Sequence, residues 1–152
     1  MYNDTVTLFC QYKDQRKNIT WYPTILHNVN LNKDKAAIIA QYGAESQDKA
    51  VLNVRYRLDN GKIMVGDKIW LPPKEWDRQT NDLLSSSLTF TDGQEFDFFY
   101  EGEWPDENPI GDEDYGIDGF YNYMNRYYDY VFAITSVGGP YSVIPHFEIM
   151  GA

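Results

Sequence analysis

Apolar and polar side chains alternate over several short stretches of the chain, and this two-residue period is typical of half-buried β-strands. The clearest of these stretches are residues 5–12, 19–31 and 49–58. Pro23 lies inside the second stretch and has no backbone donor, so we expect an edge position, a bulge or a break there. Asp59-Asn60-Gly61 is a turn signal, and residues 62–65 are predicted to pair with 49–58 as a hairpin.

Shorter β-type runs follow, separated by glycine and proline. Residues 66–71 are predicted to form a strand that ends at Pro72-Pro73, and a turn of helix can follow because proline suits the first helical position. Residues 85–104 resemble two strands that flank Asp92-Gly93. Residues 130–152 are predicted to form a strand, a turn at Gly138-Gly139 and a second strand.

Two stretches have the composition of helices. In residues 119–129, apolar side chains recur at i, i+3, i+4 and i+7, and Asp118 precedes them as a candidate N-cap. The recurring residues are Phe120, Tyr123, Met124 and Tyr127. Residues 33–44 suit a short helix, but Ile38 and Ile39 would also suit a strand, and the pattern does not decide between the two.

These elements predict a mainly β fold in a single domain over residues 1–152. Many short strands separated by turns about every 8–12 residues indicate a small barrel or sandwich of antiparallel strands with one or two short helices. A long acidic loop is predicted as an insertion at about residues 104–118. Pro105 and Pro109 disfavour regular structure there until about Ile117.

Charge divides the chain into two unequal parts. The net charge is −10. Residues 1–78 hold 12 basic and 9 acidic side chains, whereas residues 79–152 hold 14 acidic side chains and a single basic one, Arg126. Nucleic-acid binding depends on neutralising phosphates, so this acidic part opposes it. We therefore expect no specific nucleic-acid binding.

The sequence contains no convincing metal or cofactor motif. Asp114, Gly116, Asp118 and Gly119 match the first positions of a calcium-binding loop, but Asn125 stands where the bidentate glutamate is needed. A solvated loop is the better interpretation, and we predict no metal and no cofactor. We also expect exposed carboxylates here, so replacing Asp112, Glu113 and Asp114 by asparagine should change stability by about 0.5 kcal/mol or less.

Candidate catalytic residues are equally sparse. His27 and His146 lie in strand-like runs without metal-ligand spacing, and the single cysteine, Cys10, is predicted to pack as a small hydrophobe. Ser85-Ser86-Ser87 lacks the glycines of a nucleophile elbow. Carboxylate pairs such as Glu101 and Glu103 are expected by chance among 23 acidic residues. We predict that the protein is not an enzyme.

Aromatic residues make up 16% of the chain, more than one small core readily hides. About half of them are expected to line the β core, and tyrosine and tryptophan on the surface are typical of protein interfaces. Exposed aromatics also form sugar-stacking platforms, so a carbohydrate-binding module is an alternative. The candidate interface residues are Trp104, Asp112, Glu113, Asp114, Asp118, Tyr121, Tyr127 and Tyr128.

Three segments resemble minor capsid, head-closure or head–tail connector proteins of tailed phages and prophages of Gram-positive bacteria. Residues 6–31 contain a short strand, a polar turn and Trp-Tyr-Pro-Thr. Residues 49–58, followed later by 90–103, are similar to the central strands of that family. Residues 130–152 share its closing pattern of Ile134-Thr135-Ser136-Val137, a glycine turn, then His146, an aromatic residue and Gly151. The acidic insertion is not covered by the resemblance.

The resemblance implies a structural virion protein that assembles as a ring below the portal, helps to retain packaged DNA and docks the tail. Its partners would be other neck, portal and tail proteins, with DNA passing through the channel. A tail-completion or tail-terminator protein is the alternative within the same virion. We expect a protein made in the bacterial host cytoplasm, with no signal peptide and no membrane contact, that ends in the neck of the virion.

Overall fold

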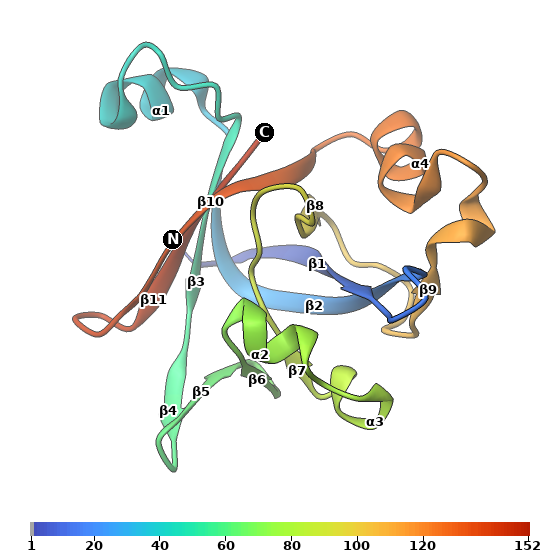
Figure 1. Cartoon of the computed structure of the whole chain (residues 1–152). Coiled ribbons are helices and arrows are strands. Elements are labelled where there is room, and N and C mark those ends of the chain that lie inside the picture. The colour runs from blue at the N-terminus through green and yellow to red at the C-terminus, as the bar shows by residue number, and fades with distance from the viewer. Residues whose placement is uncertain (1) are drawn as a thin grey trace.

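The computed structural model describes residues 2–152, apart from the side chains of residues 81 and 82, and most of its elements are β-strands (Figure 1). The strands are β1 (Asp4–Lys13), β2 (Ile19–Asn32), β3 (Ala50–Arg55), β4 (Arg57–Asp59), β5 (Lys62–Val65), β6 (Lys68–Trp70), β7 (Ser87–Leu88), β8 (Phe98–Glu101), β9 (Ile110–Gly111), β10 (Val131–Tyr141) and β11 (His146–Gly151). The helices are α1 (Lys35–Tyr42), α2 (Pro73–Asp77), α3 (Asn81–Leu84) and α4 (Gly119–Tyr127), with a 3₁₀ turn, η1 (Asp112–Tyr115).

Within residues 2–152, six antiparallel strands form a sheet that closes on itself. Their order is β1-β8-β10-β11-β3-β2, and β2 pairs back with β1 to complete the ring. Short β9 adds to the other edge of β2. Closure leaves few free sheet edges, which otherwise promote aggregation. The predicted mainly β barrel or sandwich is thus confirmed.

The long strand β2 links most of the structure. Its first part pairs with β1 from Ile19 to Val29, and its last residues, Asn30–Asn32, pair with β3. Pro23 does not interrupt the strand: it lies opposite Phe9 of β1. Among the described strands, nothing pairs with the other edge of β2 between Trp21 and Asn30, so Pro23 occupies the edge position that its missing donor requires.

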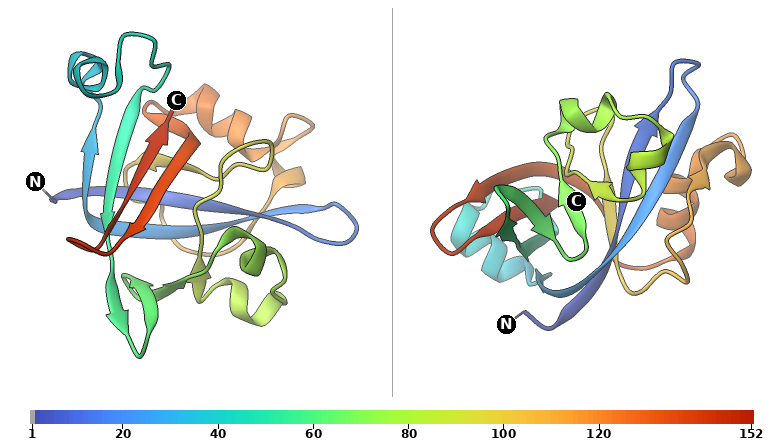
Figure 2. Two further views of the ribbon diagram at one scale, coloured as in Figure 1. Left: turned by 60° about the vertical axis from the view of Figure 1, so that its left-hand side comes forward. Right: turned by 90° about the horizontal axis from the view of Figure 1, so that it is seen from below.

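A second sheet of four strands, within the described residues, covers one end of the ring. Its order is β4-β5-β6-β7, and β4 and β5 form the hairpin predicted around Asn60-Gly61. Helices α2 and α3 lie beside this sheet (Figure 2). Helix α2 begins directly at Pro73, as the two prolines indicated. Helix α3 and the turn η1 were not predicted.

Two hydrophobic clusters explain why β1 is buried on both faces. Its residues Val6, Leu8 and Cys10 point into a cluster to which all six ring strands contribute, with Phe147 and Ile149 of β11 among its members. Phe9 points the opposite way, into a second cluster that α4 covers with Phe120 and Met124. Cys10 is buried and its pKa is raised by that burial, so it packs as a small hydrophobe, as predicted.

Local chemistry resolves the ambiguous stretch at residues 33–44. The chain forms helix α1, because the Asp34 carboxylate accepts hydrogen bonds from the backbone N–H groups of Ala36 and Ala37. Only Ile38 of this helix is fully buried, packing beneath it. Ile39 is 37% exposed. The helical composition therefore prevails over the strand-like isoleucine pair.

Two predicted boundaries are wrong. Strand β10 continues through Gly138-Gly139 to Tyr141, so the turn to β11 lies at residues 142–145. The two strands predicted to flank Asp92-Gly93 are present as β7 and β8, and they belong to different sheets: β7 joins the small sheet and β8 the large one. Regular structure also resumes before Ile117, since β9 pairs with β2 and η1 follows it.

Asp97 ties three separate segments together beside β8. Its carboxylate accepts from the backbone N–H of Gln11 at 2.7 Å and of Thr91 at 2.9 Å, and its carbonyl accepts from Ile134 at 3.0 Å. Burial raises the pKa of this carboxyl well above its usual range, while the two backbone N–H groups oppose that shift.

Replacing Asp97 with alanine is expected to lower the free energy of unfolding by about 1–3 kcal/mol, because two backbone N–H groups lose their acceptor. The matched control is Asp92→Ala, an exposed carboxylate in the same loop, which should change it by about 0.5 kcal/mol or less. Urea unfolding followed by tryptophan fluorescence measures both. Equal decreases in the free energy of unfolding of the two variants would show that Asp97 does not hold these segments together.

Candidate functional site: an acidic and aromatic face

The acidic segment predicted as a loop runs along β1 and β2 and is attached to them at several points. The first is near Trp104, whose backbone N–H donates to the Thr7 hydroxyl at 3.0 Å. That hydroxyl in turn donates to the Gly102 carbonyl at 2.9 Å. Thr7 is fully buried, so these bonds hold the start of the segment against the centre of β1.

Glu107 supplies the second attachment, at the unpaired edge of β2. Its Oε2 accepts from the backbone N–H of Ile25 at 2.8 Å and lies 3.8 Å from Nζ of Lys68. Lys68 also donates to the Pro23 carbonyl at 3.1 Å and to the Thr24 hydroxyl at 2.8 Å. Burial lowers the pKa of Lys68, and Glu107 partly offsets that effect. A side chain thus takes the place of a neighbouring strand here.

Asp112 supplies the third attachment and joins three parts of the fold. Its Oδ1 accepts from the indole N–H of Trp21 and from the backbone N–H of Phe120, both at 2.8 Å. The second bond satisfies a free donor in the first turn of α4. Gly119 has φ +83°, and an added Cβ would lie 2.7 Å from the Asp112 carboxylate, so this position requires glycine.

Two expectations from the sequence are corrected by this arrangement. Asp118 precedes α4, but its side chain makes no capping hydrogen bond, because Asp112 fills that role. The expectation of exposed carboxylates at Asp112, Glu113 and Asp114 is wrong for Asp112, which is half-buried and accepts two hydrogen bonds. Glu113, Asp114 and Asp118 are exposed, in keeping with solvated carboxylates.

The predicted aromatic residues fall into two groups. Trp104 and Tyr121 face inward: Trp104 contacts the rings of Phe9 and Phe120, each with centroids 5.6 Å apart, and Tyr121 lies 4.8 Å from Phe96. Tyr127 is 65% exposed and Tyr128 is 39% exposed. About half of the aromatic residues were expected in the core, and two of the candidate interface residues belong to that half.

The exposed residues around η1 and α4 form one surface, which we call the acidic–aromatic face: Glu113, Asp114, Ile117, Asp118, Tyr127 and Tyr128. Ile117 is fully exposed, at 104% of its reference area. Beside it a hollow of about 410 Å³ is lined by Tyr115, Tyr123 and Tyr127, with Arg126 at its rim. Arg126 lies 3.5 Å from Asp118. Sequence patterning did not single out Ile117, Tyr115 or Tyr123 for this surface.

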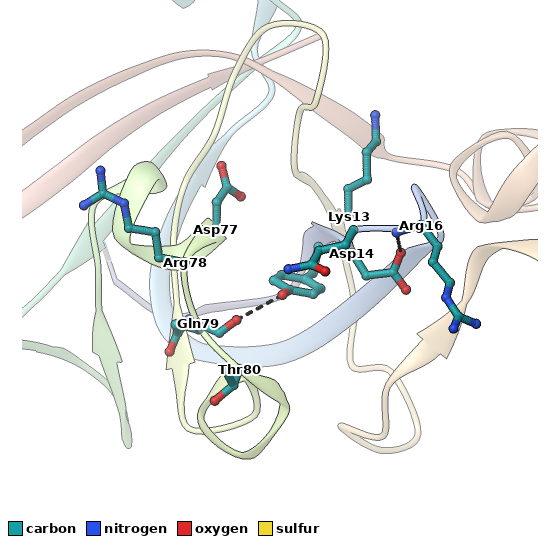
Figure 3. Close-up of a pocket in the computed structure, with 9 residues that line it drawn as sticks. Lys13, Asp14, Arg16, Asp77, Arg78, Gln79 and Thr80 are labelled. Atoms are coloured by element: carbon teal, nitrogen blue, oxygen red, sulfur yellow. Dashed lines mark hydrogen bonds between the residues drawn. The ribbon is translucent and has the colours of Figure 1, made fainter.

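A separate cavity of about 700 Å³ lies between the β1–β2 turn and α2 (Figure 3). Its polar groups are used locally: the Asp14 carboxylate accepts from the backbone N–H groups of Arg16 and Asn18, and the Tyr12 hydroxyl donates to the Gln79 carbonyl at 3.0 Å. Figure 3 shows Arg16 and Arg78 pointing away from each other on opposite sides. Both signs of charge line the cavity and do not converge on one point.

Other candidate chemistry is dispersed. Within the part of the chain that the structure describes, no three histidine, cysteine, aspartate or glutamate side chains lie close enough to hold a metal ion. His27 is exposed, beside the Thr5 hydroxyl, and His146 contacts the Ile144 carbonyl through Nδ1. Among residues 2–152, no helix is long and apolar enough to cross a membrane.

Asp112→Ala is expected to lower the free energy of unfolding by about 1–3 kcal/mol, because the Trp21 indole and the Phe120 amide lose their acceptor. Asp114→Ala removes an exposed carboxylate two residues away and should cost about 0.5 kcal/mol or less. Thermal unfolding followed by circular dichroism compares the two variants. A neutral Asp112→Ala variant would show that the segment does not depend on this anchor.

Of the comparisons with known proteins, one gives a match, and it covers the whole chain. Neither the curated proteins nor the solved structures contain a match. One family model matches residues 1–152, which is the full length of the chain. The protein therefore belongs to the family of unknown function DUF6751.

Proposed function

We propose that this protein is a structural, non-enzymatic subunit of a tailed phage, of the head-closure or head–tail connector type. Copies would form a ring below the portal in the neck of the virion. The resemblance at both ends of the chain supports this proposal, since those segments supply β1, β2, β10 and β11. These are four of the six strands in the closed ring of the described fold, so the resemblance covers its framework.

The acidic–aromatic face is the observation that carries the proposal. It exposes Ile117 and Tyr127 beside free carboxylates, on a segment that Glu107 and Asp112 hold in place. Exposed apolar side chains on a preformed surface favour binding to another protein, because little ordering is required when the partner docks. A catalytic site would instead need converging acid, base or nucleophile groups.

The charge of the chain suits a neck protein. A ring that surrounds packaged DNA must let the duplex pass without binding it tightly. The balance of −13 over residues 79–152 repels phosphates at short range, although salt screens the effect beyond about 8 Å. We propose that DNA passes through the ring without specific contacts, and that portal, neck and tail proteins are the partners.

Two other functions compete with this one. A tail-completion or tail-terminator protein would use the same kind of ring at a neighbouring position in the virion. A carbohydrate-binding module belongs to a different class and is favoured by the exposed rings of Tyr127 and Tyr128. The two classes differ in what they require, because a connector must form a ring whereas sugar binding by exposed rings needs no assembly.

Native mass spectrometry and negative-stain electron microscopy of the purified chain test the proposal. We expect closed rings with an open centre, alone or after addition of the portal protein encoded by the same phage. A glycan array is the control for the alternative class. A chain that stays monomeric, does not bind the portal protein and binds glycans would contradict the connector proposal.

A further inference from the structure

Exposed apolar side chains also lie on two neighbouring hairpins that are joined near Tyr56. The residues come from the β4–β5 hairpin and from the β10–β11 turn, and we call this surface the hairpin end: Arg55, Arg57, Leu58, Lys62, Tyr141, Val143 and Ile144. Leu58 is 67% exposed, Val143 82% and Ile144 71%. Exposed aliphatic side chains on neighbouring turns of a small domain are typical of a contact surface.

The two turns are held together rather than being independent. The Tyr56 hydroxyl donates to the Tyr141 carbonyl at 2.7 Å, and the Tyr56 backbone N–H donates to the Pro145 carbonyl at 3.3 Å. Arg57 donates to the Gly66 carbonyl at 2.6 Å, which fixes the β4–β5 hairpin to its own sheet. The hairpin end is therefore preformed, as the acidic–aromatic face is.

Charge distinguishes the hairpin end from the acidic–aromatic face. Arg55, Arg57 and Lys62 outnumber Asp59 and the nearby Asp67, so the hairpin end has a positive balance, with Arg55 lying 3.8 Å from the centroid of the Tyr2 ring. The acidic–aromatic face carries Glu113, Asp114 and Asp118. Arg126 is next to Asp118, and Lys17 lines a hollow with Glu113, so the acidic groups still outnumber the basic ones. Each surface thus combines exposed apolar side chains with charge, and the signs are opposite.

The two surfaces also face different directions. In Figure 1 the β10–β11 turn lies at the lower left and the β4–β5 hairpin at the bottom, while η1 and α4 lie at the upper right. Both views in Figure 2 keep the β10–β11 turn and α4 on opposite sides of the ring of strands. The hairpin end of one molecule therefore cannot contact the acidic–aromatic face of the same molecule.

We propose that the hairpin end of one copy docks on the acidic–aromatic face of a second copy of this chain. Val143 and Ile144 would enter the hollow lined by Tyr115, Tyr123 and Tyr127, while Arg55 and Lys62 approach Glu113 and Asp114 of that second copy. Apolar contact provides affinity and the charges select the orientation. This inference rests on the proposed ring and names the contact that builds it.

Such a contact is heterologous, since each copy uses two different surfaces. Repeating it adds copies head to tail, and a rotation that closes after a whole number of copies gives a ring. A symmetric contact of one surface with itself is disfavoured, because it places like charges opposite each other. The charge division seen along the sequence then becomes a means of orienting neighbouring subunits.

Two charge-reversed variants test this contact. The first, Arg55→Glu with Lys62→Glu, makes the hairpin end acidic and leaves Arg57, which holds the hairpin, unchanged; the second, Glu113→Lys with Asp114→Lys, makes the opposite face basic. Alone, each variant presents like charges at every contact, so its self-association should weaken by about tenfold or more. An equimolar mixture places opposite charges at every contact again and should recover assembly of alternating copies.

Sedimentation velocity at about 0.05 M and 0.5 M salt measures the assembly, and the wild-type association should weaken at the higher salt. Lys49→Glu with Lys74→Glu is the control, since it changes the net charge as much as the first variant does, but at exposed sites elsewhere. Circular dichroism confirms that each variant is folded. We expect weaker assembly of each reversed variant by itself, recovered assembly when the two variants are mixed, and unchanged assembly of the control variant.

Two results would overturn the inference, and they separate it from the proposed function. If wild type assembles into rings and both reversed variants assemble equally well, the ring stands but this contact is wrong. If wild type stays monomeric at every concentration and salt, and remains so with the portal protein, then the contact and the ring proposal both fail.

Discussion

The structure depends on the two edges of one long strand, β2. Every backbone donor and acceptor on a strand needs a partner, and β2 extends over 14 residues. One edge pairs with β1 and closes the ring, while the other is shared between β3, β9 and the Glu107 side chain. Because the acidic segment completes that second edge, it is part of the folded barrel and does not hang from it as a free loop.

This attachment determines which acidic groups remain available for function. Glu107 and Asp112 accept hydrogen bonds from the backbone and from Trp21, so their charge is used within the fold. Glu113, Asp114 and Asp118 remain in solvent, beside Ile117 and Tyr127. The result is a preformed surface with a defined shape and sign of charge. The proposed subunit contact needs these two properties, since a disordered acidic loop would lose entropy on docking.

Local patterning predicted the elements whose structure is decided by nearby residues. The alternating stretches became β1, β2 and β3, the Asn60-Gly61 signal became a hairpin, and the helical spacing from Phe120 to Tyr127 became α4. Each depends on side-chain periodicity or turn chemistry within about ten residues. The resemblance to phage connector proteins likewise used local patterns, and what it implies about function stays a proposal.

Long-range contacts account for the errors. Asp112 acts on Trp21, which is 91 positions away in the chain, and no local pattern reveals that partner. Strand β9 is only two residues long and exists because the edge of β2 is open beside it. In β10, pairing with β11 carries Gly138 into the strand, although glycine there resembles a turn. The side chains of Trp104 and Tyr121 point inward, because they pack against the second apolar cluster that lies beneath α4.

The central claim is that the acidic segment is a fixed part of the barrel, and hydrogen exchange of assigned amides tests it most directly. The Ile25 amide donates to Glu107, and the Phe120 amide and Trp21 indole donate to Asp112. We expect these protons to exchange at least roughly 100-fold more slowly than in an unfolded chain. Exchange at the unfolded rate, with the β1–β2 amides still protected, would show that the segment is free and would contradict the account.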